Sequence, residues 1–335
     1  MLLIDRKTFP RDKVCGGCLS GPAATRFREI IGSRSDRPGV PSTEITFVVG
    51  SYRVTCHPQG TTWMVPRSEM DACLVETAQE AGAETRFGSA ATLERGERGW
   101  DPIIESEPIQ TKLVLIASGL GGMPAKMGIR NVSTARRMVA QQWIQPARPP
   151  LPRLGGVELH WLRGGYVGLA TPRPDECVVA LASDVPTGAD ETPFEHLRRL
   201  NPGADVWNLF PADAPRRFDA KGTAGFPWMP DRLGDQNALL IGDAAGYAEP
   251  YSGEGIGQAM RSADCAVQAI MAEGDVLGAY SALMQQCHAR VIRRTRMIRS
   301  VLRSPVVQYL SSKRPVMPAQ WLAFLVERVH VRGVI

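Results

Sequence analysis

The residues best suited to hold a ligand lie between positions 239 and 263, which read LLIGDAAGYAEPYSGEGIGQAMRSA. The apolar run at 239–241 predicts an inner strand, and Gly242 permits a sharp turn at its end. Asp243 then stands where its carboxylate can accept hydrogen bonds from hydroxyl groups of a ligand. A glycine-rich bend and a helix start follow, and the residues there with an expected role are Pro250, Gly253, Gly255 and Ile256. Because backbone N–H groups at a helix N-terminus favour negative charge, this order predicts a cofactor site.

The helix that begins near Ile256 carries small and apolar residues at helical spacing, which predicts that one of its faces is buried. The residues expected on that face are Ala259, Met260, Ala263, Ala266, Val267 and Ile270.

This segment resembles the second cofactor motif of FAD-dependent oxidoreductases of the aromatic hydroxylase and geranylgeranyl reductase superfamily. The resemblance implies that Asp243 binds the ribityl and pyrophosphate region of FAD, and that Gly255 and Ile256 face the pyrimidine edge of the flavin. Amides at a helix start stabilise negative charge by roughly 0.3 to 2 kcal/mol, which would favour the reduced flavin. A helix that only closes a tight turn is the alternative interpretation.

The N-terminus carries a second match, LLIDR at 2–6 and FPRDKVCGG at 9–17, which resembles the geranylgeranyl reductase branch. In such proteins the second strand ends in an acidic residue that binds the adenosine ribose, a role that falls to Asp5. The stretch that follows would run beside the pyrophosphate and the flavin. The implied cofactor contacts at this end are Asp5, Arg6, Arg11, Cys15, Gly16 and Gly17.

A dinucleotide-binding unit begins with a strand, G-x-G-x-x-G and a helix, about 20 residues before the acidic residue that binds the ribose. Here that acidic residue is Asp5, and no G-x-G-x-x-G follows a strand elsewhere in the sequence. We therefore expect an N-terminally truncated flavoprotein, without the loop that would bind the FAD pyrophosphate.

Three further regions match the motifs of the superfamily only in part. Arg67 and Asp71 match an R-x-x-F-D pattern except for the aromatic residue, which implies a cofactor contact for Arg67, with an ion pair to Asp71 as the alternative. Gly119 follows an apolar run at 112–118 that predicts a buried strand, although hydroxylases place Asp-Gly where this chain has Ser-Gly. Tyr166 and Pro172 match the substrate motif of the reductases only in part.

These elements predict an α/β fold in which an antiparallel substrate sheet is inserted into a Rossmann-like FAD domain, with a helical C-terminus. Strands are expected at 45–49 and 52–56, as a hairpin, and at 138–144, 157–162, 166–170 and 177–182. A helix is expected to run to position 81, with Ser68 as its N-cap. We expect the FAD domain to comprise 1–40, 62–130 and 227–285, the substrate domain 41–61 and 131–226, and a basic helical region 286–335.

The composition is ordinary for a soluble enzyme: 335 residues, 44% hydrophobic and 22% charged. No apolar run reaches the ~18 residues of a membrane span, and no secretory signal is present, so a cytoplasmic location is expected. A net charge of +5 does not favour nucleic-acid binding. Cys15 and Cys18 form a C-x-x-C that suggests a redox pair or half a metal site, but no second pair accompanies it, and no metal site is predicted.

The tail is strongly basic, since residues 277–325 contain no acidic residue. Its cationic residues are Arg290, Arg293, Arg294, Arg296, Arg299, Arg303, Lys313 and Arg314. Apolar residues lie among them at helical spacing, so this helix could contact an anionic membrane peripherally. A helix packed on the domain with a solvated basic face is the alternative.

The resemblance implies an FAD-dependent oxidoreductase that takes electrons from NAD(P)H and passes hydride through flavin N5 to a small apolar or isoprenoid-like substrate. No side chain stands out as an acid, a base or a nucleophile. The alternatives are an FAD-dependent monooxygenase of the same fold and a non-catalytic remnant unable to hold FAD.

Overall fold

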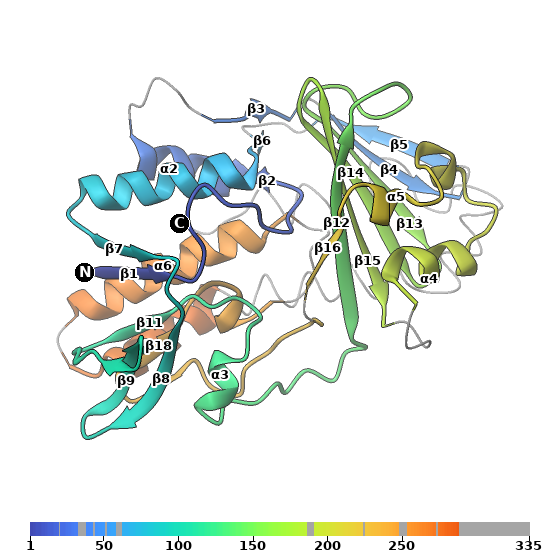
Figure 1. The fold of residues 1–335 in the computed structure, drawn as a ribbon. Helices are drawn as coiled ribbons and strands as arrows, with labels where there is room; N and C mark the ends of the chain where they lie inside the picture. Colours follow the sequence, from blue (N-terminus) through green and yellow to red (C-terminus); the bar gives the residue numbers. More distant parts are fainter. Residues whose placement is uncertain are drawn as a thin grey trace.

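The computed structural model describes residues 1–287, except 20, 33–37, 43, 51, 58–61, 186–190, 224, 248–252 and 273. The protein has an α/β fold made of two halves that lie side by side (Figure 1). One half groups short parallel strands with the helices α2 (Arg67–Glu80) and α6 (Gly255–Met271), and the other contains a large sheet.

The helical half contains two separate pairs of parallel strands. β1 (Leu2–Asp5) pairs with β7 (Glu84–Phe87), and β11 (Val114–Ile116) pairs with β18 (Ala238–Leu240). A short strand, β17 (Gly234–Asp235), joins β18 in the antiparallel direction. The strands expected at both cofactor motifs are therefore present, and each ends next to a carboxylate, Asp5 or Asp243.

The strand expected at 112–118 is shorter and more exposed than predicted. Only 114–116 form β11, and the Leu115 side chain is 36% exposed. An unbroken apolar run indicates burial on both faces only where both faces are covered, and one face of β11 is partly open.

The large sheet has seven strands in the order β16-β12-β15-β14-β13-β4-β5. Its strands are β4 (Glu44–Val49), β5 (Tyr52–Cys56), β12 (Met138–Pro146), β13 (Gly156–Leu162), β14 (Gly165–Arg173), β15 (Glu176–Asp184) and β16 (Lys221–Gly222). The strands predicted here, including the hairpin, are confirmed. The expected antiparallel sheet is wrong in one respect, because β13 pairs with β4 in parallel. A long connection through the helical half separates these two strands, and such a crossover permits parallel pairing.

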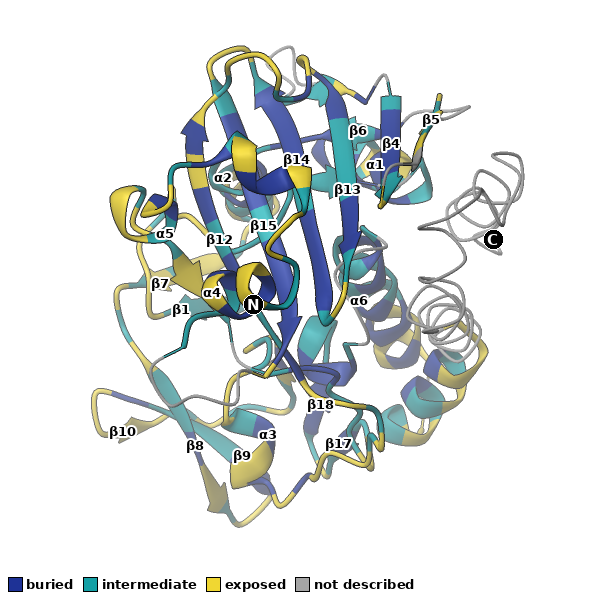
Figure 2. Ribbon diagram, turned by 90° about the vertical axis from the view of Figure 1, so that its right-hand side faces the viewer, coloured by how far each residue is buried: buried dark blue, intermediate teal, exposed yellow. Residues whose placement is uncertain are grey.

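The two faces of this sheet bury different clusters. On one face Trp143 packs edge-on against Phe194 and Phe210, beneath α4 (Pro193–Leu200), whose first turn is closed by a capping box from Thr192 to Glu195. The opposite face carries Met138, Tyr166 and Phe226. Figure 2 shows buried residues running along β14 and β15 in the middle of the sheet.

The remaining elements are short or connect the two halves. They are β2 (Cys18–Leu19), β3 (Val40–Pro41), β6 (Trp63–Met64), β8 (Ala91–Gly96), β9 (Gly99–Ile104), β10 (Glu107–Pro108), α1 (Gly21–Ile31), α3 (Met123–Lys126), η1 (Asp205–Leu209), α5 (Ala214–Arg217) and η2 (Gly242–Ala245). Among the described residues, no helix has an apolar stretch long enough to cross a membrane. The helix expected to run to position 81 is α2, but Ser68 is not its N-cap, because Pro66 takes that place without a side-chain hydrogen bond.

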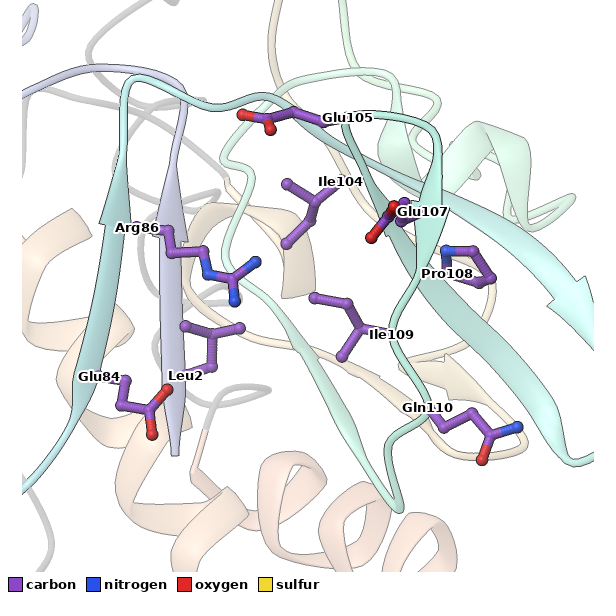
Figure 3. Close-up of a pocket in the computed structure, with 9 residues that line it drawn as sticks. All are labelled: Leu2, Glu84, Arg86, Ile104, Glu105, Glu107, Pro108, Ile109 and Gln110. Carbon is purple, nitrogen blue, oxygen red and sulfur yellow. The ribbon is translucent and has the colours of Figure 1, made fainter.

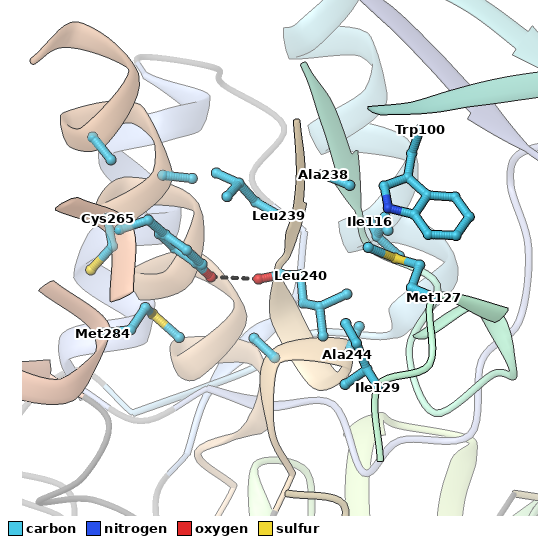
Figure 4. Packing of buried hydrophobic residues seen from close by; sticks show 14 of the residues in the cluster. Trp100, Ile116, Met127, Ile129, Ala238, Leu239, Leu240, Ala244, Cys265 and Met284 are labelled. Carbon is cyan, nitrogen blue, oxygen red and sulfur yellow. Dashed lines mark hydrogen bonds between the residues drawn. The ribbon is translucent and has the colours of Figure 1, made fainter. Parts of the chain in front are cut away.

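The core of the helical half lies between β18, α6 and a further helix at residues 276–287 (Figure 4). The buried hydroxyl of Tyr280 donates a hydrogen bond of 2.5 Å to the carbonyl of Leu240 and so fixes that helix on β18.

The buried face of α6 agrees with the predicted one at Ala266 and differs from it at Val267 and Ile270. Its buried residues are Gly257, Gln258, Ser262, Cys265, Ala266 and Ala269. Val267 and Ile270 are instead 58% and 40% exposed. The reason is close packing: a Cβ placed on Gly257 would lie 3.1 Å from the Cβ of Ala23 in α1, so small residues face inward and larger ones outward.

Candidate cofactor site

The Asp243 carboxylate lies just past the end of β18, where the sequence placed it. Gly242 adopts a left-handed φ of +61°, and its N–H donates to the Ser262 hydroxyl of α6 at 2.7 Å. This turn presents Asp243 with a side chain 24% exposed, 3.9 Å from Nζ of Lys13. Burial raises the pKa of the Asp243 carboxyl, and the positive charges of Lys13 and Arg67 oppose that rise. The ionised carboxylate is thus disfavoured by burial and only partly stabilised by the two cations.

Arg11 joins the N-terminal motif to α2. Its guanidinium contacts Asp5 at 3.3 Å and Asp71 at 3.4 Å, and it lies 4.9 Å from the centre of the Phe9 ring. Its Nε is buried and has no acceptor among the described residues. A buried donor without an acceptor is uncommon in folded proteins, so this Nε can receive an acceptor from a ligand.

Arg67 makes the ion pair that the sequence offered as an alternative. Its Nε and Nη2 donate to the two oxygens of Asp71, each at 2.9 Å. Burial lowers the pKa of the Arg67 guanidinium, but its contacts with Cys15 and Asp71 outweigh that effect, so the pKa is raised. Arg67 also acts electrostatically on Asp243. A cofactor contact for Arg67 stays a prediction.

The C-G-G-C turn passes over β6. Gly17 has a φ of +70°, and a Cβ there would lie 2.5 Å from the carbonyl oxygen of Val65, so only glycine fits. A Cβ on Gly16, in contrast, would meet nothing within 4 Å. Burial, with smaller effects of Cys15 and Glu254, raises the pKa of the Cys18 thiol to about 12. Gly16 therefore borders open space, whereas Gly17 and Cys18 are structural.

The start of α6 closes the other side of the site. Gly253 packs on Cys18, and a Cβ on Gly255 would lie 3.3 Å from the Tyr247 ring. Glu254, which is 3% exposed, accepts a hydrogen bond of 2.9 Å from Arg261. The first N–H groups of a helix have no partner within the helix, so those of Gly255 and Ile256 can face an anionic ligand. Pro250 lies outside the described residues.

Two further residues predicted to contact the cofactor are Gly119 and Arg6. Gly119 has a φ of +67° with open space beyond its Cα, and Leu120 next to it packs in the same cluster as Tyr247. Arg6 is exposed, and it makes no ion pair with the described residues of the network around Arg11.

The sheet face that carries Tyr166 turns toward the site. Tyr166 packs with Trp161, Phe226 and the partly buried Leu120 and Tyr247, which come from the two cofactor-side loops. The carboxamide oxygen of Gln142 is also buried and has no donor among the described residues. Because side chains alternate along a strand, Gln142 shares this face with Met138. Pro172 is buried as well, but it is not part of the cluster around Tyr166.

The geometry fits FAD at the residues that are present. A carboxylate at the end of β1, a second beyond β18, an unsatisfied Arg11 donor and a helix N-terminus all border one region. The sequence contains no strand followed by G-x-G-x-x-G and a helix, so the contacts of such a loop to a pyrophosphate are not supplied by the residues printed here.

The structure also has a pocket away from this site. A pocket of about 630 Å³ lies between β1, β7 and the β9–β10 hairpin, where Leu2 and Arg86 face Ile104 and Ile109 (Figure 3). It contains none of the predicted cofactor residues. Within the described part of the chain, no group of three or more His, Cys, Asp or Glu residues could hold a metal.

Sequence reasoning missed two members of the site. Lys13 belongs to the N-terminal motif, but the motif implies no cofactor contact for it. The signal in the sequence is its positive charge, which suits the carboxylate expected at Asp243. Gln142 gives no signal in the sequence, because its position on the inner face is set by strand pairing.

Comparison with protein families finds no family model that matches. Two relatives are similar in sequence. Kynurenine 3-monooxygenase of Xanthomonas oryzae is 25% identical over 244 residues, covering 66% of this chain and 52% of that protein. Digeranylgeranylglycerophospholipid reductase 1 of Methanothermobacter thermautotrophicus is 24% identical, covering 67% of this chain and 59% of that protein. The chain thus spans between half and three fifths of the length of these relatives.

Solved structures share the fold at low sequence identity. A flavoprotein/dehydrogenase from Cytophaga hutchinsonii matches with a TM-score of 0.74 and 15% identity, covering 98% of this chain and 86% of that one. A geranylgeranyl bacteriochlorophyll reductase-like protein from Thermoplasma acidophilum matches with a TM-score of 0.70 and 17% identity, covering 99% and 86%. In sequence and in fold, the chain therefore resembles the superfamily of FAD-dependent oxidoreductases that includes monooxygenases and geranylgeranyl reductases, which confirms the resemblance drawn from its motifs.

Proposed function

We propose that this protein is an FAD-dependent oxidoreductase that reduces an apolar, isoprenoid-like substrate with electrons from NAD(P)H. The observation that carries the proposal is that two ion-pair systems lie close together, since Arg67 of one acts electrostatically on Asp243 of the other. Asp5, Arg11, Asp71 and Arg67 form one continuous chain of charges, and Lys13 with Asp243 forms the second.

Each of these residues has a part that suits a dinucleotide. Asp5 would accept hydrogen bonds from ribose hydroxyls, and Asp243 from the ribityl chain. Arg11 would give its unsatisfied Nε to an acceptor, and the first turn of α6 would face the pyrimidine edge. When bound, FAD supplies two-electron transfer between a reductant and a substrate.

The proposed substrate class follows from the sheet face opposite the site. Apart from Gln142 and the buried Asp184, which is the register partner of Met138, the residues that line it are apolar or aromatic. Ala140, Gly168 and Ala180 keep its middle flat. A flat apolar face suits a hydrocarbon chain. The digeranylgeranylglycerophospholipid reductase among the relatives supports this choice.

A monooxygenase is the second candidate, supported by the kynurenine 3-monooxygenase match. A remnant that no longer holds FAD is the third. These candidates differ in what they require: the reductase needs no oxygen, the monooxygenase does, and the remnant binds no flavin.

The test begins with protein purified from its complete gene and titrated with FAD, with Asp243→Asn as the site variant and the surface Asp231→Asn as the matched control. The loaded protein is then given NADPH or NADH and geranylgeraniol as the probe, under argon and under labelled oxygen. A reductase is expected to add two hydrogen atoms to the probe under argon.

The other outcomes decide against the reductase. Labelled oxygen in the product identifies a monooxygenase. A folded protein that does not bind FAD identifies the remnant. Flavin binding with no change in the probe under either gas overturns the proposed substrate class.

A further inference from the structure

Two cysteines outside the cofactor site lie against each other. Cys265 is on the inner face of α6 and is 4% exposed, in the same buried cluster as Tyr280 and Met284 of the helix at 276–287. Figure 4 shows Cys265 and Met284 on neighbouring helices. Both cysteines of the pair, Cys265 and Cys287, are free thiols.

Cys287 shares the face of its helix that packs on α6. It follows Tyr280 by seven positions and Met284 by three, and such positions lie on one side of a helix. The Tyr280 hydroxyl anchors this side to Leu240. Burial raises the pKa of the Cys265 thiol to about 12, and the neighbouring Cys287 thiol adds to that rise.

We propose that Cys265 and Cys287 are a peroxide-sensitive thiol pair, oxidised reversibly to a disulfide that joins α6 to the helix at 276–287. The proposal is independent of flavin binding. Exposure of Cys287 gives an oxidant access, while the buried Cys265 is held in place to complete the bond.

The chemistry is balanced with hydrogen peroxide as the oxidant. Its O–O bond breaks as the Cys287 thiol becomes a sulfenic acid and one water leaves. The sulfur of Cys265 then displaces the second oxygen as water, forming the S–S bond. Two thiols lose two electrons and two protons in all, and one peroxide becomes two waters.

The disulfide would fix the end of the helix at 276–287 on α6. That helix leads directly into the basic segment at 288–335. Oxidation would therefore tether the beginning of the basic segment to the helix whose other end borders the cofactor site.

The sequence makes the test direct, because no Lys or Arg lies between Arg261 and Arg290, and trypsin leaves both cysteines in one peptide, 262–290. Reduced full-length protein is treated with hydrogen peroxide, unfolded, alkylated and analysed by mass spectrometry. We expect this peptide to lose two hydrogen atoms and to escape alkylation at both sulfurs. Added thiol should reverse the change.

Cys287→Ser is the decisive variant, because its side chain is exposed and the change replaces only the sulfur by oxygen. Cys265→Ala tests the buried partner, and Cys56→Ser is the matched control that should retain the disulfide. Oxidation should raise the melting temperature of the wild type by roughly 5 °C and leave that of Cys287→Ser unchanged.

Three results would overturn the proposal. The peptide 262–290 could take up two alkyl groups at every peroxide dose. The loss of two hydrogen atoms could occur in the peptide 14–26, which holds Cys15 and Cys18, and not in 262–290. Two copies of the chain could be joined through Cys287.

Discussion

Lys13 and Asp243 are 230 positions apart in the sequence and meet with Nζ 3.9 Å from the carboxylate oxygen. The contact brings the N-terminal motif onto the turn that precedes α6. The pKa of Asp243 is nevertheless raised, because the effect of burial outweighs the attraction of Lys13 and Arg67. A carboxylate kept in such a place is better explained by a ligand than by stability.

Asp243→Asn should weaken FAD binding about 10- to 150-fold, since a hydrogen bond to a charged group contributes about 1.5 to 3 kcal/mol. Because the folded-state pKa is raised, Asp243 lowers stability as the pH rises through that pKa. Without flavin, the variant should therefore be at least as stable as the wild type at neutral pH. Flavin titration and urea unfolding at several pH values check both statements, with Asp231→Asn as control. Normal affinity in the variant would remove Asp243 from the site.

Gly16→Ala and Gly17→Ala form a matched pair of neighbours. A Cβ on Gly16 meets no atom within 4 Å, so the first variant should keep its stability within about 0.5 kcal/mol and lose flavin affinity. A Cβ on Gly17 would lie 2.5 Å from the Val65 carbonyl oxygen, so the second should lose about 2 kcal/mol or more. Urea unfolding and flavin titration measure the pair. Equal stability of the two variants would contradict the placement of this turn.

The Arg67–Asp71 pair is largely buried, with side chains 13% and 9% exposed. Arg67→Met should lower the free energy of unfolding by about 3 kcal/mol, because Asp71 keeps only the weaker contact with Arg11. The double variant with Asp71→Leu should cost less than the sum of the single changes, giving a coupling of about 1 to 3 kcal/mol.

The Arg130–Asp231 pair is the control for this cycle, because it is more open to solvent: the Arg130 side chain is 83% exposed and the Asp231 side chain 19%. Its coupling should stay below about 1 kcal/mol. If both cycles gave the same small coupling in urea unfolding, the buried Arg67–Asp71 pair would stabilise the protein no more than the Arg130–Asp231 pair does.

Glu158 makes the large sheet sensitive to acid. Burial raises the pKa of its carboxyl, but hydrogen bonds from His160 and Arg53 and their charges outweigh this, and the pKa falls below its ordinary 4.5. Its contribution to stability is therefore present above pH 4.5 and lost as the pH falls through the lowered pKa. Glu158→Gln should be less stable than wild type at neutral pH, and the gap should close in acid. The exposed Glu107→Gln should show no such gap in unfolding measurements across pH.

Peripheral membrane contact is our proposal for the basic tail, whose residues 288–335 lie outside the described part. On α6, Val267, Ile270 and Met271 are 58%, 40% and 79% exposed at adjacent helical positions, so the described part of the chain also has an exposed apolar stripe. The protein should sediment with anionic vesicles at low salt and less at 1 M, where the Debye length is ~3 Å. Arg293, Arg296 and Arg299 changed together to Gln should abolish this.

The matched control for this experiment changes Arg98, Arg163 and Arg216, all exposed and outside the tail, to Gln. It should sediment as the wild type does. Equal sedimentation of both triple variants would instead favour a tail packed on the protein, and would weaken the case for a substrate dissolved in a membrane.

Features determined by nearby residues could be predicted from the sequence. The Gly242–Asp243 turn, the strand before it and the hairpin of β4 and β5 each depend on a few adjacent side chains, and all are present. The parallel pairing of β4 with β13 and the outward direction of Val267 could not be predicted, because each depends on which distant segment packs there. For the same reason Lys13 and Gln142 gained their positions only in the folded chain.

The pairing of β11 with β18 has a consequence for how the protein assembles. The antiparallel strands β13, β14 and β15 follow one another as hairpins and can pair as soon as they are synthesised. β11 must wait for β18, and Arg26 of α1 pairs with Asp264 of α6 across a sequence separation of 238 positions. Contacts of such long sequence separation form slowly. We therefore expect the inserted sheet to fold first on the ribosome, and the cofactor half to stay open until α6 has left the exit tunnel.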